Sequence, residues 1–241
     1  AYTTCDQGAT WEVKNKELHR TRLTDIVFSP TYRSDHTLFS ASKGYILIST
    51  DGGQEWSKTE LIHNEDRTAP LRRRVSSLLG RAGIPSYLRG WLLTKLEREA
   101  PYATMLAVSP NFASDGTLYF GTRLHGVFKS VDGGHSASAV WDGMGRLTRY
   151  LAISPDYASD QTVYVSVHGM GVYKTTDGGQ TWLPANNGLS LGNARGSLNA
   201  QTDSLSGDEQ DIQLVISPSY GTDRTVFAAS PGGLFKTSDA G

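Results

Sequence analysis

The sequence predicts an all-β fold built from repeated antiparallel units, and two recurring motifs at a fixed spacing predict it. The first motif is Ser-Pro-x-aromatic-x-Ser/Thr-Asp-x-Thr-Leu/Val-aromatic, and the second is a polar Asp-Gly-Gly turn. A fixed period is the signature of solenoids and propellers, because each unit must stack on its neighbours to bury an apolar face. We therefore expect a single repeat architecture over residues 1–241.

Both motifs recur in register along the chain. The first motif occurs as SPTYRSDHTLF (29–39), SPNFASDGTLY (109–119), SPDYASDQTVY (154–164) and SPSYGTDRTVF (217–227). The second occurs as TCDQGATW (4–11), STDGGQEW (49–56), SVDGGHSA (130–137), TTDGGQTW (175–182) and TSDAG (237–241). In the four units that carry both, the first Ser precedes the second Asp by 22, 23, 23 and 22 residues. Unrelated turns would not keep this register.

Each unit is predicted to contain four short strands. An apolar run ends at Ser-Pro, where the proline stops ladder pairing and the Asp-containing stretch forms a turn. A strand rich in β-branched and aromatic residues follows, then a Gly-containing turn, a third strand, the Asp-Gly-Gly turn and a fourth strand. Four antiparallel strands are the content of one propeller blade. We therefore predict a β-propeller with blades at about 24–61, 103–142, 148–184 and 211–241.

The composition excludes several classes of protein. Hydrophobic residues are 38% of the chain and charged residues 20%, and the 26 glycines are typical of a folded chain with many turns. No apolar run approaches the roughly 20 residues that a membrane-spanning helix needs. The formal net charge of −1 offers no general attraction to nucleic acid, so we expect no nucleic-acid partner.

The one cysteine and the first residues of the chain give little information about the fold or the location of the protein. Cys5 is the single cysteine, which excludes an internal disulfide and a multi-cysteine zinc site. The first residues, AYTTCDQGATW, have no initiator Met and neither the basic nor the apolar region of a signal peptide. We therefore expect a processed chain or an excerpt, and we expect no cofactor.

The form Ser/Thr-x-Asp-x-Gly-x-Thr-Trp is the Asp-box, or BNR repeat, and this chain resembles Asp-box β-propellers. Proteins with this box include sialidases, xyloglucan-type endoglucanases, sortilin-type receptor domains and photosystem assembly factors. The alternation of the two motifs also resembles exported bacterial propellers. The resemblance implies an architecture that hydrolases, receptors and scaffolds share, and an extracellular, periplasmic or cell-surface location.

In that family the box is the hairpin turn between the third and fourth strands of a blade. Here a glycine such as Gly178 permits positive φ, the Asp177 carboxylate can accept bonds from turn N–H groups, and the tryptophan packs beneath. A carboxylate saturated by such donors is a poor general base. We therefore expect a structural role for the box residues Asp6, Asp51, Asp132, Asp177, Asp239, Trp11, Trp56 and Trp182.

Two departures from the pattern carry expectations of their own. In SVDGGHSASAVW the tryptophan, Trp141, comes four residues late, which predicts a distorted turn or a bulged fourth strand. A box also stands at each end of the chain, although a blade completed by both termini needs only one. We therefore expect part of a propeller with more than four blades, and closure of a four-bladed ring is the alternative.

The strand order predicts one constant face and one variable face. The motif-bearing turns share the first, whereas the second-to-third-strand turns and the connections between blades share the second, and variable loops on a rigid frame often carry binding sites. We expect either solvated turn residues or a shallow cationic site for a carboxylate, sulfate or glycan at Lys43, Arg123, His125 and His168. A metal site is not expected, because these histidines lack acidic partners at fixed spacing.

Two connections between blades are enlarged. Residues 62–101 carry apolar positions at helical spacing on both sides of Gly83-Ile84-Pro85, which predicts a helical hairpin. Over 65–99 there are eight Lys/Arg against four Asp/Glu, so this piece has a net charge of +4. Its apolar face, with Trp91 and Leu92, either packs onto the propeller or contacts a protein partner or, through 70–99, an anionic membrane surface. Residues 185–210 are expected to form a polar surface loop.

The acidic residues do not form a recognisable catalytic set. A glycosidase needs two carboxyl groups across a cleft, and a sialidase also needs a cluster of arginines. Arg123, Arg146 and Arg149 have no repeat-equivalent partners, and Asp211 is one of a few acidic residues outside the turns. We therefore favour a non-catalytic binding, scaffold or assembly module that takes a protein or a glycan. The alternative is part of a secreted sialidase- or xyloglucanase-like glycoside hydrolase with catalytic residues partly outside this chain.

Overall fold

The computed structural model describes residues 2–4, 6–13, 23–42, 45–60, 103–123, 125–141, 147–189 and 211–241. Three of the sequence predictions fall outside these residues. They are the helical insertion 62–101 with Trp91 and Leu92, the candidate residue Lys43, and positions 190–210 of the polar loop.

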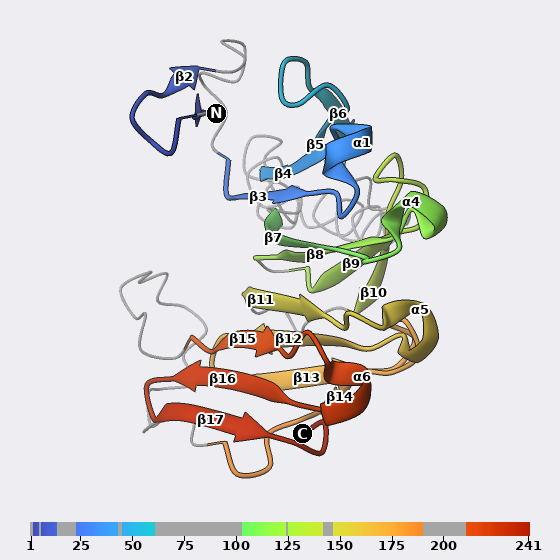
Figure 1. Cartoon of the computed structure of the whole chain (residues 1–241). Coiled ribbons are helices and arrows are strands. Elements are labelled where there is room, and N and C mark those ends of the chain that lie inside the picture. The colour runs from blue at the N-terminus through green and yellow to red at the C-terminus, as the bar shows by residue number, and fades with distance from the viewer. Residues whose placement is uncertain are drawn as a thin grey trace, which may run out of the picture.

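Four antiparallel sheets follow one another along the chain and stack on one another, and we call them blades 1 to 4 (Figure 1). Blade 1 contains β3 (Asp25–Phe28), β4 (Leu38–Ser42), β5 (Tyr45–Ser49) and β6 (Ser57–Glu60). Blade 2 contains β7 (Ala103–Val108), β8 (Leu118–Thr122), β9 (Val127–Ser130) and β10 (Ser138–Trp141). Blade 3 contains β11 (Thr148–Ile153), β12 (Val163–Val167), β13 (Gly171–Thr175) and β14 (Leu183–Pro184). Blade 4 contains β15 (Gln213–Ile216), β16 (Val226–Ser230) and β17 (Gly233–Thr237).

Within each blade the strands pair in chain order, so every blade is a simple meander. A separate hairpin of β1 (Tyr2–Thr3) and β2 (Glu12–Val13) forms a two-stranded sheet before blade 1. The predicted all-β fold made of propeller-type blades is therefore confirmed.

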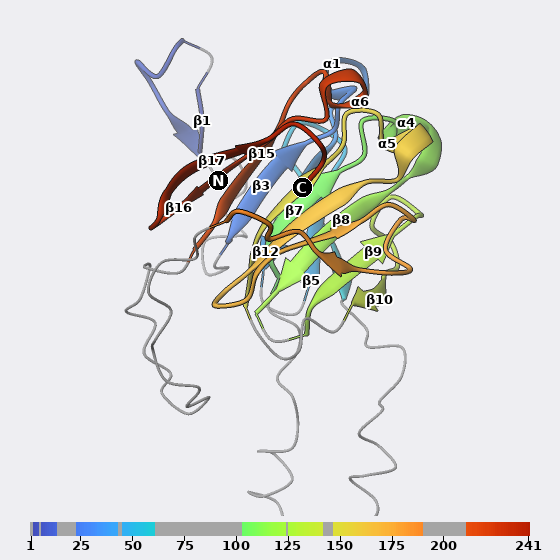
Figure 2. The same cartoon turned by 90° about the horizontal axis from the view of Figure 1, so that it is seen from below.

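A four-residue helix follows the first strand of every blade, where the sequence predicted only a polar turn. The helices are α1 (Tyr32–Asp35), α4 (Phe112–Asp115), α5 (Tyr157–Asp160) and α6 (Tyr220–Asp223), and Figure 2 shows them together on one side of the molecule. In α1 the Asp35 carboxylate accepts bonds from the Ser29 hydroxyl at 2.5 Å and the Thr37 N–H at 2.8 Å. Each helix ends in a left-handed residue that closes its last turn, namely His36, Gly116, Gln161 and Arg224.

The helix and the Asp-Gly turn of the same blade are joined by a backbone hydrogen bond. The N–H of the residue after the turn aspartate donates to the carbonyl of the left-handed residue, at 2.9 to 3.2 Å. The donor and acceptor pairs are Gly52 and His36, Gly133 and Gly116, Gly178 and Gln161, and Ala240 and Arg224. The two motif-bearing turns therefore lie on the same face, as the strand order predicted. The bond also explains the spacing of 22 or 23 residues between the motifs.

The apolar cores lie between neighbouring blades. Blades 1 and 2 share one core that includes Phe39, Ile48 and Phe120. Blades 2 and 3 share a second around Tyr119 and Val165, and blades 3 and 4 share a third. The first strands β3, β7, β11 and β15 lie next to one another in series. Stability therefore arises from contacts between consecutive units, as in other repeat architectures.

The fourth strand of blade 2 is bulged. The pairing of β10 with β9 shifts register between Ala139 and Trp141. The sequence predicted a distorted turn or a bulge from the late position of Trp141, and the bulge is confirmed. The extra residue lets β10 pair with β9 again after the longer loop. The turn that contains Asp132 therefore keeps its geometry.

The contact between β8 and β11 leaves no room for a side chain at Gly121. A Cβ there would lie 2.4 Å from Thr148 Oγ1, and Thr148 is fully buried with its hydroxyl donating to the Thr122 carbonyl at 2.7 Å. We expect Gly121→Ala to lower the free energy of unfolding by about 1–3 kcal/mol, because a locked neighbour must shift. Thermal or urea unfolding of the purified chain measures this.

Ser166 is the matched control, since it holds the same repeat position in blade 3. Its hydroxyl is buried and makes no hydrogen bond within the described part of the chain. Ser166→Ala should therefore leave stability unchanged or raise it slightly. Equal losses from both substitutions would contradict the steric explanation.

Candidate functional site

Five turns share most of one hydrogen-bond pattern, and four of them lie beside the short helices on the motif-bearing face. We call these the Asp turns, at residues 4–10, 49–55, 130–136, 175–181 and 237–241. In 175–181, the Thr175 hydroxyl donates to Asp177 Oδ1 at 2.7 Å and accepts the Gly179 N–H at 2.9 Å. The Thr181 N–H donates to Oδ1 at 2.9 Å and its hydroxyl to Oδ2 at 2.6 Å. Both carboxylate oxygens are thus bound by donors of their own turn.

Most of this pattern is found in the other Asp turns. Asp6 and Asp132 accept the corresponding hydroxyl and N–H groups of Thr10 and Ser136. In 49–55 the last position is Glu55, whose N–H donates to both oxygens of Asp51 at 3.0 Å in place of the missing hydroxyl. The turn therefore tolerates loss of a hydroxyl as long as backbone donors replace it.

These donors hold the carboxylates in the charged form. The pKa of Asp6 is lowered to about 2, chiefly by the Thr10 hydroxyl. For Asp132, burial alone would raise the pKa, but the Ser136 hydroxyl and N–H and the Ser130 hydroxyl together lower it to about 2. The Thr181 hydroxyl holds the pKa of Asp177 well below its usual range. Such groups neither release nor accept a proton near neutral pH.

The tryptophans of the Asp turns differ, because Trp56 and Trp182 make contacts with other residues whereas Trp11 is exposed. Gly178 has φ of 70°, so the predicted positive φ is confirmed. Trp56 packs at its turn and donates its ring N–H to the Gly53 carbonyl at 3.0 Å, and Trp182 stacks on Trp141 at 5.7 Å between ring centroids. Trp11, in contrast, is 61% exposed, and the expectation that it packs beneath its turn is wrong. Its hairpin is a two-stranded sheet of its own, with no blade face for the ring to cover.

On the opposite, variable face, the candidate residues differ in exposure. Arg123 is partly exposed, whereas His125 is only 6% exposed, so the expectation that His125 stands at the rim is wrong. The reason is a tight turn after β8. The Thr122 hydroxyl donates to the Gly126 carbonyl at 2.8 Å and accepts the His125 N–H at 3.0 Å, which draws the histidine inward.

His168 is paired with a carboxylate that the sequence did not connect with it. His168 Nδ1 lies 3.1 Å from Asp211 Oδ1, and Arg149 Nε lies 2.9 Å from the same oxygen. The Asp211 side chain is 16% exposed, so its carboxylate is largely shielded from water. An incoming anion would have to displace Asp211, which removes His168 from the predicted cationic site.

The ion pair of Arg149 and Asp211 replaces a simpler link between blades. At the same repeat position, the Thr24 hydroxyl of blade 1 donates to the Ala103 carbonyl of blade 2 at 2.7 Å. The Thr104 hydroxyl of blade 2 likewise donates to the Thr148 carbonyl of blade 3 at 2.9 Å. In β7 and β11 a register shift spans this position, and a bulge of this kind re-aims a side chain. The cluster is therefore a link between blades 3 and 4.

Asp25 is a second carboxylate committed to a link between blades. Its two oxygens accept the Leu106 N–H of blade 2 at 2.7 Å and the Ile26 N–H at 2.8 Å. Burial raises the pKa of Asp25, and the two backbone donors oppose that shift. With both oxygens bound to backbone groups, Asp25 has no oxygen directed at a substrate.

The first residues of the predicted polar loop belong to the core. Ala185 is buried between blades 3 and 4, and Asn186 Oδ1 accepts the Val172 N–H at 2.8 Å. The prediction of a surface loop starting at 185 is therefore wrong for Ala185 and Asn186, whereas Asn187 and Gly188 are exposed. Next to them is a cavity of about 130 Å³ with a mostly apolar lining that includes Tyr164 and Phe235. This volume is below the roughly 300–1,000 Å³ of typical small-molecule sites.

The described ranges contain neither a candidate metal site nor a helix that could span a membrane. No group of three or more His, Cys, Asp or Glu side chains there could hold a metal ion. None of the helices in these ranges is long and apolar enough to cross a membrane.

Comparison with solved structures identifies the class of fold. The GH74 xyloglucanase from Xanthomonas campestris matches with a TM-score of 0.54 at 16% identity, over 99% of this chain and 33% of that one. YCF48 from Cyanidioschyzon merolae matches with a TM-score of 0.54 at 12% identity, over 98% and 62%. The extracellular domain of a hybrid two component system from B. thetaiotaomicron matches with a TM-score of 0.58 at 9% identity, over 98% and 24%.

These proteins share the β-propeller fold, and the four sheets of this chain are propeller blades. The chain spans less than two thirds of the length of each of these structures. No protein-family model and no curated protein matches the sequence. Because the matched structures include a hydrolase and an extracellular domain of a sensor system, the fold leaves the activity undecided.

The hydrogen bonds of the Asp turns predict their contribution to stability. Asp177→Ala removes the acceptor of the Thr175 hydroxyl and of the Thr181 N–H and hydroxyl. We expect a loss of about 1–2 kcal/mol in the free energy of unfolding, measured by urea titration. Thr176→Ala is the matched control, because Thr176 is exposed in the same turn and should have little effect. A neutral Asp177→Ala would contradict a structural role for the turn.

The lowered pKa values also predict acid sensitivity. A carboxyl group whose pKa is lower in the folded than in the unfolded chain stabilises the fold above the unfolded pKa, about 4 for Asp. That stability is lost as pH falls through the folded pKa, which is about 2 for Asp6 and Asp132. We therefore expect the melting temperature to drop as pH falls from about 4 towards 2, with a smaller drop in Asp132→Ala. A melting temperature constant over this window would contradict the hydrogen-bond assignment.

Proposed function

We propose that this chain is an Asp-box β-propeller module that binds a partner and does not catalyse a reaction. It acts as a binding, scaffold or assembly unit, and its interaction face is formed by the second-to-third-strand turns and the 62–101 insertion. The observation that carries this proposal is that the aspartates of both repeated motifs are committed to hydrogen bonds within their own turns.

Blade 3 illustrates this commitment. Asp160 accepts the Ser154 hydroxyl at 2.7 Å and the Thr162 N–H at 2.9 Å, and Asp177 accepts three donors of its own turn. A general acid or base needs an oxygen within hydrogen-bond reach of the substrate. The recurrent carboxylates thus stabilise a frame and leave recognition to residues that do not repeat.

The partner we propose is a protein or a glycan on the variable face. Arg123 is partly exposed there, and Lys43 occupies the corresponding turn of blade 1 in the sequence. Cations on a shallow surface suit a carboxylate or sulfate group. The 70–99 segment, with Trp91 and Leu92, is basic and apolar in sequence and suits an anionic membrane surface. This role fits an extracellular, periplasmic or cell-surface location.

The alternative is a portion of a secreted glycoside hydrolase. The propeller fold shared with a GH74 xyloglucanase favours it. Such an enzyme needs two carboxyl groups about 5–5.5 Å or 6.5–9.5 Å apart across the cleft. Asp25, a partly buried carboxylate, is bound by two backbone donors, so the alternative would depend on residues outside the described ranges or outside this chain.

Polysaccharide binding and cleavage distinguish the two functions. We expect the purified chain to be retained in affinity electrophoresis gels containing an acidic polysaccharide such as polygalacturonate, without release of reducing ends. Arg123→Ala and Lys43→Ala should weaken retention roughly threefold to tenfold each, because each removes a cation from the binding face. Arg33→Ala is the control, since Arg33 is exposed on α1, on the opposite face.

The purified chain also serves to test membrane binding and hydrolase activity. Replacing both Trp91 and Leu92 with Ser should reduce sedimentation with phosphatidylserine vesicles while the melting temperature stays constant. Release of reducing sugar from xyloglucan or a sialylated glycan would instead establish the hydrolase. Absence of retention by any polysaccharide, together with unchanged vesicle binding in the double variant, would overturn the proposed glycan and membrane contacts.

A further inference from the structure

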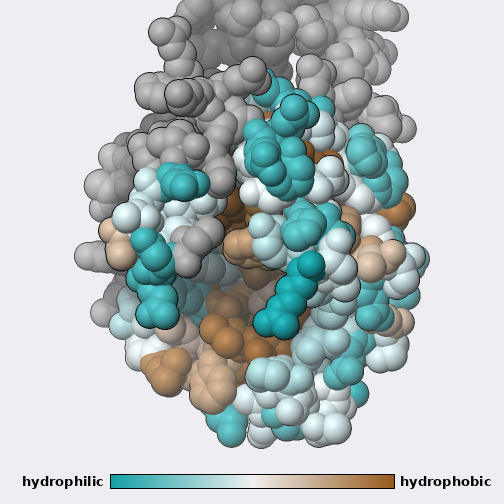
Figure 3. Space-filling model, turned by 45° about the horizontal axis from the view of Figure 1, so that its top comes forward, coloured by the Kyte–Doolittle hydropathy of each residue, from teal (hydrophilic) through white to brown (hydrophobic). Residues whose placement is uncertain are grey.

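The chain contains a single Asn-Gly bond, Asn187-Gly188, shortly after the last strand of blade 3. In such a pair the backbone nitrogen of the glycine can attack the side-chain amide of the asparagine, because glycine has no Cβ to hinder the approach. Both residues are exposed. Figure 3 shows hydrophilic side chains over much of the described surface in one view, so exposure of a polar pair does not by itself mark a reactive site. The hydrogen bonds around the pair decide whether it reacts.

Asn187 and Gly188 are the central residues of the turn 186–189. The Leu189 N–H closes this turn by donating to the Asn186 carbonyl at 3.0 Å. Gly188 has φ of 76° and Asn187 has a negative φ, which is the pattern of a type II turn. The closing hydrogen bond uses neither the Asn187 side chain nor the Gly188 N–H, and neither group is bonded to another described residue. The nitrogen that attacks and the amide that is attacked are therefore not held by the described part of the chain.

The neighbouring Asn186 is held in place. Its Oδ1 accepts the Val172 N–H at 2.8 Å and lies against Gly171, where an added Cβ would overlap it. Asn186 is also partly buried, and the residue after it is an asparagine, whose Cβ hinders attack by the backbone nitrogen. The two adjacent asparagines therefore differ in reactivity, and Asn186 serves as an internal control.

An aspartate followed by a glycine can undergo the same ring closure, and the described residues contain four such bonds. They lie at 51–52, 115–116, 132–133 and 177–178. In each of them the glycine N–H donates to a backbone carbonyl, at 2.8 to 3.2 Å. Three of these donors form the bond between the Asp turn and the short helix, and the fourth, Gly116, closes the last turn of α4. The attacking nitrogen is therefore engaged in all four bonds.

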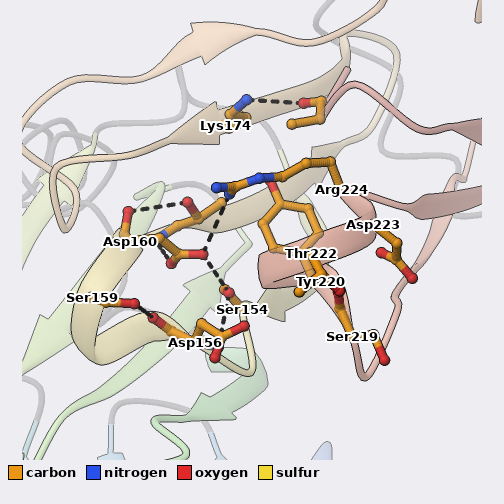
Figure 4. Close-up of polar contacts among 12 residues, drawn as sticks. Ser154, Asp156, Ser159, Asp160, Lys174, Ser219, Tyr220, Thr222, Asp223 and Arg224 are labelled. Atoms are coloured by element: carbon orange, nitrogen blue, oxygen red, sulfur yellow. Dashed lines mark hydrogen bonds and ion pairs between the residues drawn. The ribbon is translucent and has the colours of Figure 1, made fainter.

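The carboxyl groups of these Asp-Gly bonds are also poorly suited to the reaction. Ring closure needs the uncharged acid, because a carboxylate anion repels the nucleophile and has no leaving group. The Thr181 hydroxyl holds the pKa of Asp177 well below its usual range, and the Glu55 N–H lowers the pKa of Asp51. Asp115 accepts the Ser109 hydroxyl at 2.6 Å. Figure 4 shows the same arrangement in blade 3, where the Ser154 hydroxyl is directed at the carboxylate of Asp160.

We propose that Asn187-Gly188 deamidates spontaneously to aspartate and isoaspartate, and that the fold protects the four Asp-Gly bonds from the same ring closure. The Gly188 nitrogen forms a bond to Asn187 Cγ, and the side-chain nitrogen leaves as ammonia, which carries away the proton of the N–H. Water then opens the resulting succinimide. Attack of water at Cγ gives aspartate, and attack at the backbone carbonyl gives isoaspartate, in which the main chain runs through the side-chain carbon. The site is independent of the proposed function, which uses the variable face.

The isoaspartate product would change the contact between blades 3 and 4. It lengthens the main chain inside the turn 186–189, so the Leu189 N–H loses its bond to the Asn186 carbonyl. Leu189 packs against the core that these two blades share. We expect the isoaspartate form to melt about 2–4 °C lower, as for the loss of roughly one hydrogen bond. Asn187→Asp adds the charge without lengthening the main chain, and should melt like the unmodified chain.

Peptide mapping of the purified chain after incubation near neutral pH tests the proposal. Tryptic cleavage after Lys174 and Arg195 gives one peptide, 175–195, that contains both asparagines. We expect the mass gain of deamidation at Asn187 and none at Asn186. Electron-based fragmentation and labelling by an isoaspartate methyltransferase locate the isoaspartate. An Asn187 that stays intact in the folded chain, or equal deamidation of the two asparagines, would overturn the proposal.

Two variants and one change of conditions complete the test. Gly188→Ala should slow deamidation roughly tenfold, which is about 1.4 kcal/mol in the barrier, because the added Cβ hinders attack. Asn187→Gln should abolish the reaction on this timescale, and circular dichroism confirms that both variants are folded. The same peptide also contains Asp177-Gly178, and unfolding in guanidinium chloride should raise isoaspartate formation there roughly tenfold or more. Equal rates at Asp177 in the folded and unfolded chain would contradict protection by the fold.

Discussion

The architecture depends on one backbone hydrogen bond in every blade. The N–H after the turn aspartate donates to the carbonyl of the left-handed residue that ends the short helix, as from Gly178 to Gln161. This bond ties the first-to-second and third-to-fourth turns into one unit on one face. It requires a left-handed residue at the end of the helix and positive φ at the donor, which is a glycine in three blades and Ala240 in blade 4, and this explains why both motifs recur in register.

The same turns serve the contacts between blades. In blades 3 and 4 the carbonyl of the residue whose N–H forms that bond accepts a lysine and a tyrosine donor of the preceding blade, as Gly178 does from Lys129 and Tyr119. The hydrogen bond within a blade and the contact with the preceding blade therefore use the same residue, the first through its N–H and the second through its carbonyl. On the opposite face the links between blades vary, from threonine hydroxyls to the Arg149 and Asp211 ion pair. The motif-bearing face is therefore similar from blade to blade, whereas the links on the variable face differ.

Much of the fold was predictable because the chain repeats. Alternating apolar residues, Ser-Pro strand ends and Asp-Gly turns predicted the blades and the shared face of the two turns. The late position of Trp141 predicted a distorted turn or a bulge, and β10 is bulged. The candidate site was predicted less well. His125 is buried by a tight turn, Trp11 lacks a blade to cover, and Asp211 pairs with His168 across 43 residues. These outcomes depend on which blades are neighbours, and a local motif carries no information about that.

The sequence by itself determined the repeat unit, the turns that define it and the saturation of the turn aspartates, because these depend on φ and on donors within a few residues. Tertiary structure alone decided which side chains are buried, how Asp25 and Arg149 link blades, and which Asp turn the Tyr119 hydroxyl contacts. The reason is that these contacts form between blades, where the partner of a residue lies about one repeat away and is set by stacking geometry.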